Sequence, residues 1–301
     1  MTSIMTPRLS CCILYDTLVV MKDEEVRTLH LQDHRVSFVD RPGDQTSTPL
    51  VLLHGGGLDH RMWRPQLRDD SGRRVIAPDA RGHGSSSPAD TPHRLADDVV
   101  ALLDALEIER AVLAGVSMGG GTAVDVALEH PSRAAGLVVS GTGTSEPEFT
   151  DPWVLEILET WNEAGARGDV EAWVAAFMRF THGPHRTRDD VDTAVWDTIE
   201  TMVSDTMTHS LPRGEDSRPM PPTPPTPVAE TWQRLGDVTV PVLVLCGALD
   251  SIDHRRLGQR LVDAVPTGQY REIADSGHYP NLEDPVAFNA AMTDFLRRAE
   301  L

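Results

Sequence analysis

The most informative stretch of the chain is Val112-Leu113-Ala114-Gly115-Val116-Ser117-Met118-Gly119-Gly120-Gly121. A short apolar run, typical of a buried strand, leads into Gly-x-Ser-x-Gly and then into a segment of helical character. This order matches a nucleophile elbow, in which a serine sits on a sharp turn between a strand and a helix. Gly115 and Gly119 lack the Cβ atoms that would collide in so tight a turn. The same motif also occurs as an ordinary strand–helix turn, so the flanking sequence has to decide between the two.

Apolar runs on both sides of this motif have the character of strands buried on both faces of a parallel sheet. They alternate with segments whose apolar residues recur at helical spacing, which predicts an α/β fold with a mostly parallel sheet and helices on both faces. The predicted strands are 49–53, 74–78, 111–114, 135–140, 240–247 and 270–273, and the predicted helices are 62–67, 94–106, 121–130, 255–265 and 286–298. A loosely alternating pattern at 26–39 indicates a hairpin.

The composition changes between residues 146 and 231, where helical patterns occur without a strand pattern. Tryptophans recur in these helices and predict a packed core within a helical insertion. The end of the segment, residues 218–227, is rich in proline. We expect this run to be an extended connector; a ligand for a proline-recognising domain is the alternative. The expected organisation is an N-terminal extension (1–24), a first core part (25–145), the insertion (146–231) and a second core part (232–301).

Charge and cysteine content limit the partners and the compartment. A formal net charge of −19 argues against nucleic acid or an anionic membrane as a partner. The cysteines are Cys11, Cys12 and Cys246, an odd and sparse set that predicts a reducing compartment and shows no zinc-site spacing, so we expect no metal. No stretch reaches transmembrane length and no signal-peptide cleavage site follows the opening residues. We expect a cytoplasmic protein, with Met21 as an alternative start to Met1.

Three polar residues stand at the carboxyl ends of predicted strands, in the chain order Ser117, Asp250, His278. Open α/β sheets bind their ligands at that edge. A serine hydroxyl is a poor nucleophile at neutral pH and needs an adjacent base, which His278 supplies. A carboxylate behind the ring fixes its tautomer and stabilises the imidazolium. Asp250 is the preferred carboxylate because it directly follows a strand, and Asp253 is the alternative.

With these residues in place, the chain resembles the α/β-hydrolase family from about residue 26 to residue 301. The motifs that carry the resemblance are His54-Gly55-Gly56-Gly57, Asp79-Ala80-Arg81-Gly82-His83-Gly84-Ser85, Gly115-Val116-Ser117-Met118-Gly119-Gly120, Gly247-Ala248-Leu249-Asp250 and Gly277-His278. The resemblance implies Ser117 as nucleophile, His278 as base and Asp250 as orienting acid. It also implies an oxyanion hole made by the backbone N–H groups of Gly56 and Met118, and a lid formed by the helical insertion.

The resemblance further implies a cofactor-free serine hydrolase that cleaves a small, partly apolar ester or lactone through an acyl-enzyme. The elbow and the run around Asp79 look most like those of enol-lactonases and small esterases. Gly57, Trp153 and Tyr279 are the expected pocket residues. The partner is then a small-molecule substrate, and the protein a monomer or a homodimer. The alternative is a non-hydrolytic enzyme of the same fold, such as a lyase, cyclase or cofactor-free peroxidase in a biosynthetic pathway. A ligand receptor is disfavoured by the full set of catalytic residues.

Other polar residues near these motifs have structural interpretations. His54 is expected to be a packed loop histidine bonded to neighbouring backbone, and the loop around Asp79 to be architectural. Asp275 is expected to cap a loop. The histidines of the insertion are expected to be solvated; they are His182, His185 and His209.

Overall fold

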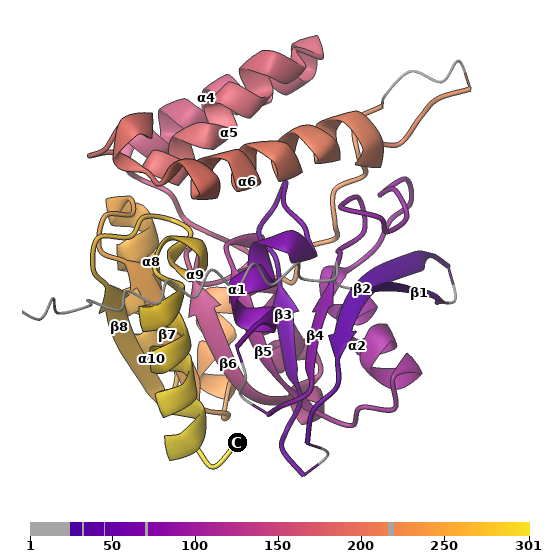
Figure 1. The fold of residues 1–301 in the computed structure, drawn as a ribbon, viewed down its shortest axis with the longest axis vertical. Helices are drawn as coiled ribbons and strands as arrows, with labels where there is room; N and C mark the ends of the chain where they lie inside the picture. The colour runs from indigo at the N-terminus through magenta and orange to yellow at the C-terminus, as the bar shows by residue number, and fades with distance from the viewer. Residues whose placement is uncertain (1–24, 32, 45, 70–71, 216–219) are drawn as a thin grey trace, which may run out of the picture.

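The centre of the molecule is one sheet with the strand order β1-β2-β4-β3-β5-β6-β7-β8 (Figure 1). The computed structural model describes residues 25–301 except 32, 45, 70–71 and 216–219, so the expectations for residues 1–24, with Cys11 and Cys12, lie outside the described residues. The strands are β1 Val26–His30, β2 Arg35–Arg41, β3 Leu50–Leu53, β4 Val75–Pro78, β5 Ala111–Val116, β6 Ala134–Ser140, β7 Val242–Gly247 and β8 Gly268–Ile273. From β4 to β8 each neighbouring pair runs parallel, whereas β2 runs antiparallel to β1 and β4. The predicted mostly parallel sheet and its hairpin are confirmed.

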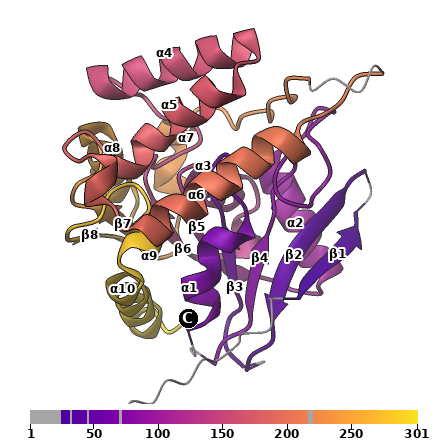
Figure 2. The ribbon, with the colours of Figure 1, turned by 45° about the horizontal axis from the view of Figure 1, so that its top comes forward.

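Helices cover both faces of the sheet (Figures 1 and 2). One face packs against α1 Arg64–Leu67 and α10 Pro285–Arg298, and the other against α2 Leu95–Ala105, α3 Met118–Glu129 and α8 Ile252–Ala264. The helices α7 Thr231–Arg234 and α9 Pro280–Glu283 are as short as α1, with four residues each. Strand β5 shows why both faces need cover, because Val112 and Ala114 belong to one core cluster while Ala111 and Leu113 belong to the other. Side chains alternate across a strand, so a strand that is apolar throughout is buried on both sides.

The helices expected between residues 146 and 231 form a layer beyond the carboxyl ends of the strands (Figure 1). They are α4 Pro152–Arg167, α5 Val170–His182 and α6 Thr193–Asp205, the last followed by a π-helical turn at Thr206–Ser210. The two ends of this segment meet, because one carboxylate oxygen of Glu146 accepts the backbone N–H of Thr231 at 2.7 Å and its hydroxyl at 2.8 Å. The chain thus leaves and re-enters the core at one place.

The described part of the proline-rich run, residues 220–227, has neither helix nor strand. It lies alongside the loop that precedes α2. The backbone N–H of Thr223 donates to the carbonyl oxygen of Ala89, and that of Thr226 donates to the carbonyl oxygen of His93, both at 2.7 Å. These bonds fix the described part of the run to the core beside the loop before α2. No helix among the described residues is long and apolar enough to cross a bilayer.

A buried carboxyl on α3 makes the stability of the core depend on pH. Asp125 is 7% exposed and accepts a hydrogen bond from Ser145 Oγ at 2.7 Å. Burial raises the pKa of the Asp125 carboxyl from 3.8 to about 7. Between these values the folded protein holds a proton that the unfolded chain has lost, so the free energy of unfolding falls as the pH rises.

Asp125→Asn keeps the acceptor for Ser145 and removes the charge. We expect its advantage in unfolding free energy over the native protein to grow by roughly 1–3 kcal/mol between pH 5 and pH 8. Urea denaturation of both proteins at the two pH values measures this. Stabilities that change in parallel would show that the carboxyl ionises normally in the fold.

Candidate active site

The elbow serine sits in strained backbone between β5 and α3. Ser117 has φ 54° and ψ −117°, in the half of φ space that residues with side chains rarely adopt. A Cβ at Gly115 would collide with the carbonyl of Gly119, and a Cβ at Gly119 with the carbonyl of Leu53, so the predicted need for both glycines is confirmed. The turn is held by the Ser117 N–H, which donates to the carbonyl oxygen of Ser140 at 2.7 Å. This hydrogen bond to the end of β6 therefore helps to maintain a conformation that presents the serine at the edge of the sheet.

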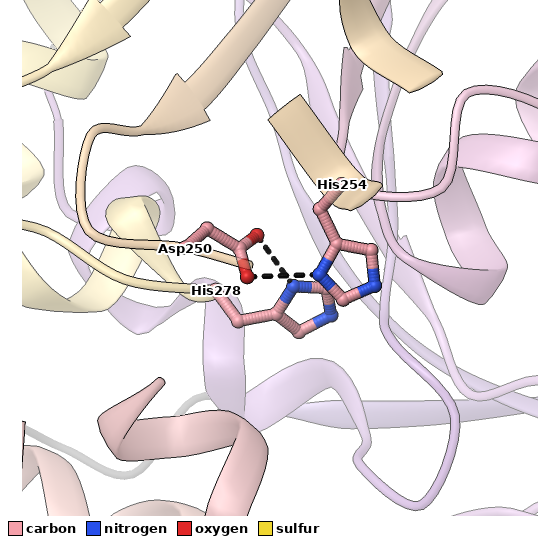
Figure 3. Close-up of side chains that lie close together, drawn as sticks. All are labelled: Asp250, His254 and His278. Carbon is pink, nitrogen blue, oxygen red and sulfur yellow. Dashed lines mark hydrogen bonds and ion pairs between the residues drawn. The ribbon is translucent and has the colours of Figure 1, made fainter. Parts of the chain in front are cut away.

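The structure brings the predicted acid and base together. Asp250 follows β7, and His278 lies in the loop between β8 and α9. His278 Nδ1 is 2.9 Å from Asp250 Oδ2 (Figure 3). The ring also lies close to the elbow, with Gly141 between the two. A Cβ added to Gly141 would be 3.0 Å from His278 Cε1 and 3.3 Å from the backbone nitrogen of Ser117. Residues from three separate segments thus converge at one point on the carboxyl edge of the sheet.

The protonation states suit a base paired with an anion. Burial opposes ionisation of Asp250, but two neighbouring imidazoles outweigh it and hold the pKa of the carboxyl well below its usual range. Burial lowers the pKa of His278 below its ordinary value of 6.5, although Asp250 counteracts this. Since Asp250 only accepts, Nδ1 of His278 carries the proton that it donates. Nε2 of the neutral ring is then free to take a proton.

The second imidazole belongs to His254, which the sequence analysis missed. His254 Nδ1 lies 2.8 Å from Asp250 Oδ1, and its ring is 4.2 Å from that of His278 with an interplanar angle of 28° (Figure 3). The helix α8 begins at Ile252, three residues before the predicted start, because Ser251 caps it by accepting the N–H of His254. The cap was the available signal, since it places His254 in the first helical turn beside Asp250.

The alternative acid has another role. The Asp253 carboxylate accepts the backbone N–H groups of Thr150 and Asp151, both at 2.6 Å, and pairs with Arg256 at 2.8 Å. Asp253 therefore holds the chain at the start of α4.

The glycine-rich loop after β3 lies against the elbow. A Cβ at Gly56 would be 3.8 Å from Met118 Cβ, so these two residues are neighbours. Met118 is the first residue of α3, and its N–H has no partner within the helix. The N–H groups on either side of Gly56 are engaged: Gly55 N with Met62 Sδ at 3.3 Å and Gly57 N with His83 Nε2 at 3.1 Å. Gly56 and Met118 are thus neighbours beside the elbow.

Two neutral histidines hold this loop. His54 Nε2 accepts the Ala80 N–H at 2.8 Å and its Nδ1 lies 2.8 Å from the carbonyl oxygen of Gly55, which confirms the expected packed histidine. Burial lowers the pKa of His83 to about 4, so its Nε2 remains an acceptor for Gly57. Asp79 accepts the N–H groups of His60 and Ser85 and is architectural, as expected.

Aromatic rings surround His278. The Tyr279 ring is buried at a centroid distance of 5.0 Å from it, and the Phe180 ring of α5 lies 5.9 Å from it. Trp153 lies one ring further away, 5.9 Å from Phe180. A Cβ at Gly57 would be 3.1 Å from the Phe177 ring. Neither Phe177 nor Phe180 could be singled out from the sequence, because helical spacing alone does not tell which face of α5 meets the core.

The remaining polar candidates lie outside this centre. His182 Nδ1 is 2.6 Å from the carbonyl oxygen of Gly183. His185 and His209 are exposed, and Asp275 occupies an exposed turn with φ 56°.

Among the residues that the structure describes, two groups of side chains are close enough to hold a metal ion, with ligand atoms within 4.8 Å of one another: Asp250, His254 and His278, and separately Asp59, His60 and Asp79. In the first group, hydrogen bonds join Asp250 to both imidazoles. In the second, a hydrogen bond joins His60 to Asp79, and Asp59 accepts instead from the backbone N–H of Arg61.

Comparison with known proteins identifies the family. A family model described as the alpha/beta hydrolase fold matches residues 48–285. A pimeloyl-(acyl-carrier protein) methyl ester esterase of Edwardsiella ictaluri is 34% identical over 82% of this chain and 92% of its own. A 3-oxoadipate enol-lactonase of Acinetobacter baylyi is 29% identical over 90% and 96% of the two chains. A solved hydrolase of Pseudomonas aeruginosa matches with a TM-score of 0.70 at 25% identity, over 91% and 99%. The chain belongs to the α/β-hydrolase family.

Proposed function

We propose that this protein is a serine hydrolase that cleaves a small, partly apolar ester or lactone. The observation that carries the proposal is the strained Ser117 at the elbow beside a buried His278–Asp250 pair. Relatives named as an ester esterase and an enol-lactonase support the choice of substrate class.

In the proposed reaction, His278 Nε2 takes the hydroxyl proton of Ser117 as Oγ attacks the substrate carbonyl. Asp250 stabilises the imidazolium that forms, and the N–H groups of Gly56 and Met118 stabilise the oxyanion. His278 then gives its proton to the departing alcohol. A water molecule then attacks the acyl carbonyl while His278 takes one of its protons. As the bond between the acyl group and Ser117 Oγ breaks, His278 returns this proton to Oγ and the acid is released.

The helical layer of residues 146–231 is the proposed lid. Phe180 and Tyr279 place apolar surface next to His278, which suits an apolar substrate portion. Trp153 lies behind Phe180, and Gly57 belongs to the glycine-rich loop after β3. We propose that these two residues shape the outer pocket.

Intact-mass measurement after incubation with a fluorophosphonate tests the proposal. We expect one covalent adduct on the native protein and none on Ser117→Ala, because only an activated serine attacks the phosphorus. Ser132→Ala, at an exposed position remote from the site, is the matched control and should be labelled like the native protein.

An unlabelled native protein, or an adduct that persists in Ser117→Ala, contradicts the proposal. A panel of esters and lactones completes the test. Native turnover retained by Ser117→Ala would instead support the non-hydrolytic alternative.

A further inference from the structure

The Asp250 carboxylate binds more partners than an acid–base pair requires. Oδ2 accepts from His278 Nδ1, whereas Oδ1 accepts from His254 Nδ1 at 2.8 Å and from the backbone N–H of Ser251 at 2.7 Å. The three side chains of Asp250, His254 and His278 are each 3–4% exposed. The proposed reaction uses one imidazole, so the second needs an explanation.

We propose that His254 is a positioning residue of the hydrolase, which fixes Asp250 through its second oxygen and supports the His278 ring by stacking against it. This inference rests on the function proposed above. It assigns to His254 no contact with substrate.

The position of His254 is itself determined by its surroundings. Its N–H is bound by the capping Ser251 at 3.2 Å. Its ring lies 5.6 Å from Phe149 in an edge-to-face arrangement and 6.0 Å from Phe180. A ring fixed by a helix cap and two aromatic neighbours is a rigid support, and rigid support of a reacting group keeps it in its productive geometry.

His254 acts on charge as well as on geometry. Because Asp250 only accepts, both Nδ1 atoms that face it carry protons, and Figure 3 shows the two Nε2 atoms turned away from the carboxylate. Two donors share one negative charge, so less of that charge is available to stabilise protonated His278. Accordingly His254 contributes to lowering the pKa of His278.

The ionisable groups that face His278 are Asp250, His254 and Tyr279. Burial raises the pKa of the Tyr279 phenol, which stays neutral. The groups contributed by α5 and by the elbow, Phe180 and Ser117, carry no charge. Removing His254 therefore raises the pKa of His278.

The test measures the second-order rate constant for fluorophosphonate labelling of Ser117 as a function of pH, which needs no knowledge of the natural substrate. His254→Phe keeps a ring but loses the donor, and His254→Ala removes both. We expect each to label about tenfold more slowly on the plateau, with the acidic limb moved to higher pH by about half a unit to one unit. His254→Gln, which retains a donor, should recover part of the rate. His130→Phe is the control, because His130 pairs with Asp97 at 2.8 Å away from the site.

If folded His254→Phe or His254→Ala is labelled at the native rate, with the acidic limb of its pH profile at the native pH, the inference is overturned. Absence of labelling in the native protein rejects the proposed function instead. Nitrogen NMR of the histidine rings provides a test without any variant. Near neutral pH, both His254 and His278 should be protonated at Nδ1. A His254 that carries its proton at Nε2 overturns the inference even if no variant folds.

Discussion

Asp250→Asn should lower kcat for ester hydrolysis by about 10⁴-fold and leave the fold intact. The native carboxylate accepts from two imidazoles, one at each oxygen. Asparagine offers one oxygen and one NH₂ group, so one of the two rings faces a donor and has to move its own proton to Nε2. When that ring is His278, it can no longer take the proton of Ser117.

The matched control is Asp253→Asn, which changes the same type of side chain three residues further along. Asp253 binds the backbone at Thr150 and Asp151, so we expect its loss to reduce stability and to change kcat by less than about tenfold. Steady-state kinetics with a p-nitrophenyl ester and circular dichroism measure both effects. If Asp253→Asn is inactive and Asp250→Asn is active, Asp253 is the catalytic acid.

Arg186→Met should destabilise the protein by about 3–5 kcal/mol, because it leaves a buried carboxylate without its partner. Arg186 Nη1 is 2.5 Å from Glu283 Oε2, with the two side chains 10% and 7% exposed. The other oxygen of Glu283 accepts the N–H of Gly277 at 2.8 Å, directly before His278. The pair thus ties the helical layer to the loop that carries the base.

Arg188→Met is the control for this prediction. Its ion pair with Asp197 spans 3.3 Å and is 45% and 60% exposed, so its loss should cost less than about 1 kcal/mol. The double variant Arg186→Met/Glu283→Gln should regain part of the loss, because no buried charge remains. Urea denaturation measures the free energy of unfolding of each variant. Equal decreases for Arg186→Met and Arg188→Met would show that the buried ion pair contributes no more to stability than the exposed one.

The sequence predicted the acid–base pair because of where its members stand. Asp250 and His278 each stand in a loop that follows a predicted strand, as Ser117 does, and strands in alternation with helices place their carboxyl ends along one edge of a sheet. The glycines of the elbow could be predicted for a steric reason that holds in any such turn. Helical patterns without a strand pattern between residues 146 and 231 also predicted helices there, and the structure has α4, α5 and α6 in this stretch.

What the sequence did not reveal depends on contacts between distant segments. The helices α7 and α9 have four residues each, too few for a periodic pattern. His254 lay before the predicted start of its helix, since the cap at Ser251 went unrecognised. Arg186 and Phe180 sit in a helical segment whose pattern predicts helices but not their orientation over His278, which tertiary packing determines.

Because the two ends of the helical layer meet at one place on the core, the layer could be exchanged between related proteins. Its ends meet at Glu146 and Thr231, so a foreign segment of any length could be spliced between them without stretching the core. A splice at Glu146 would, however, discard Thr150 and Asp151, the backbone partners of Asp253, whose side chain is fully buried one residue before His254. A chimera that joins after Asp151 keeps those partners, and with them the first turn of α8.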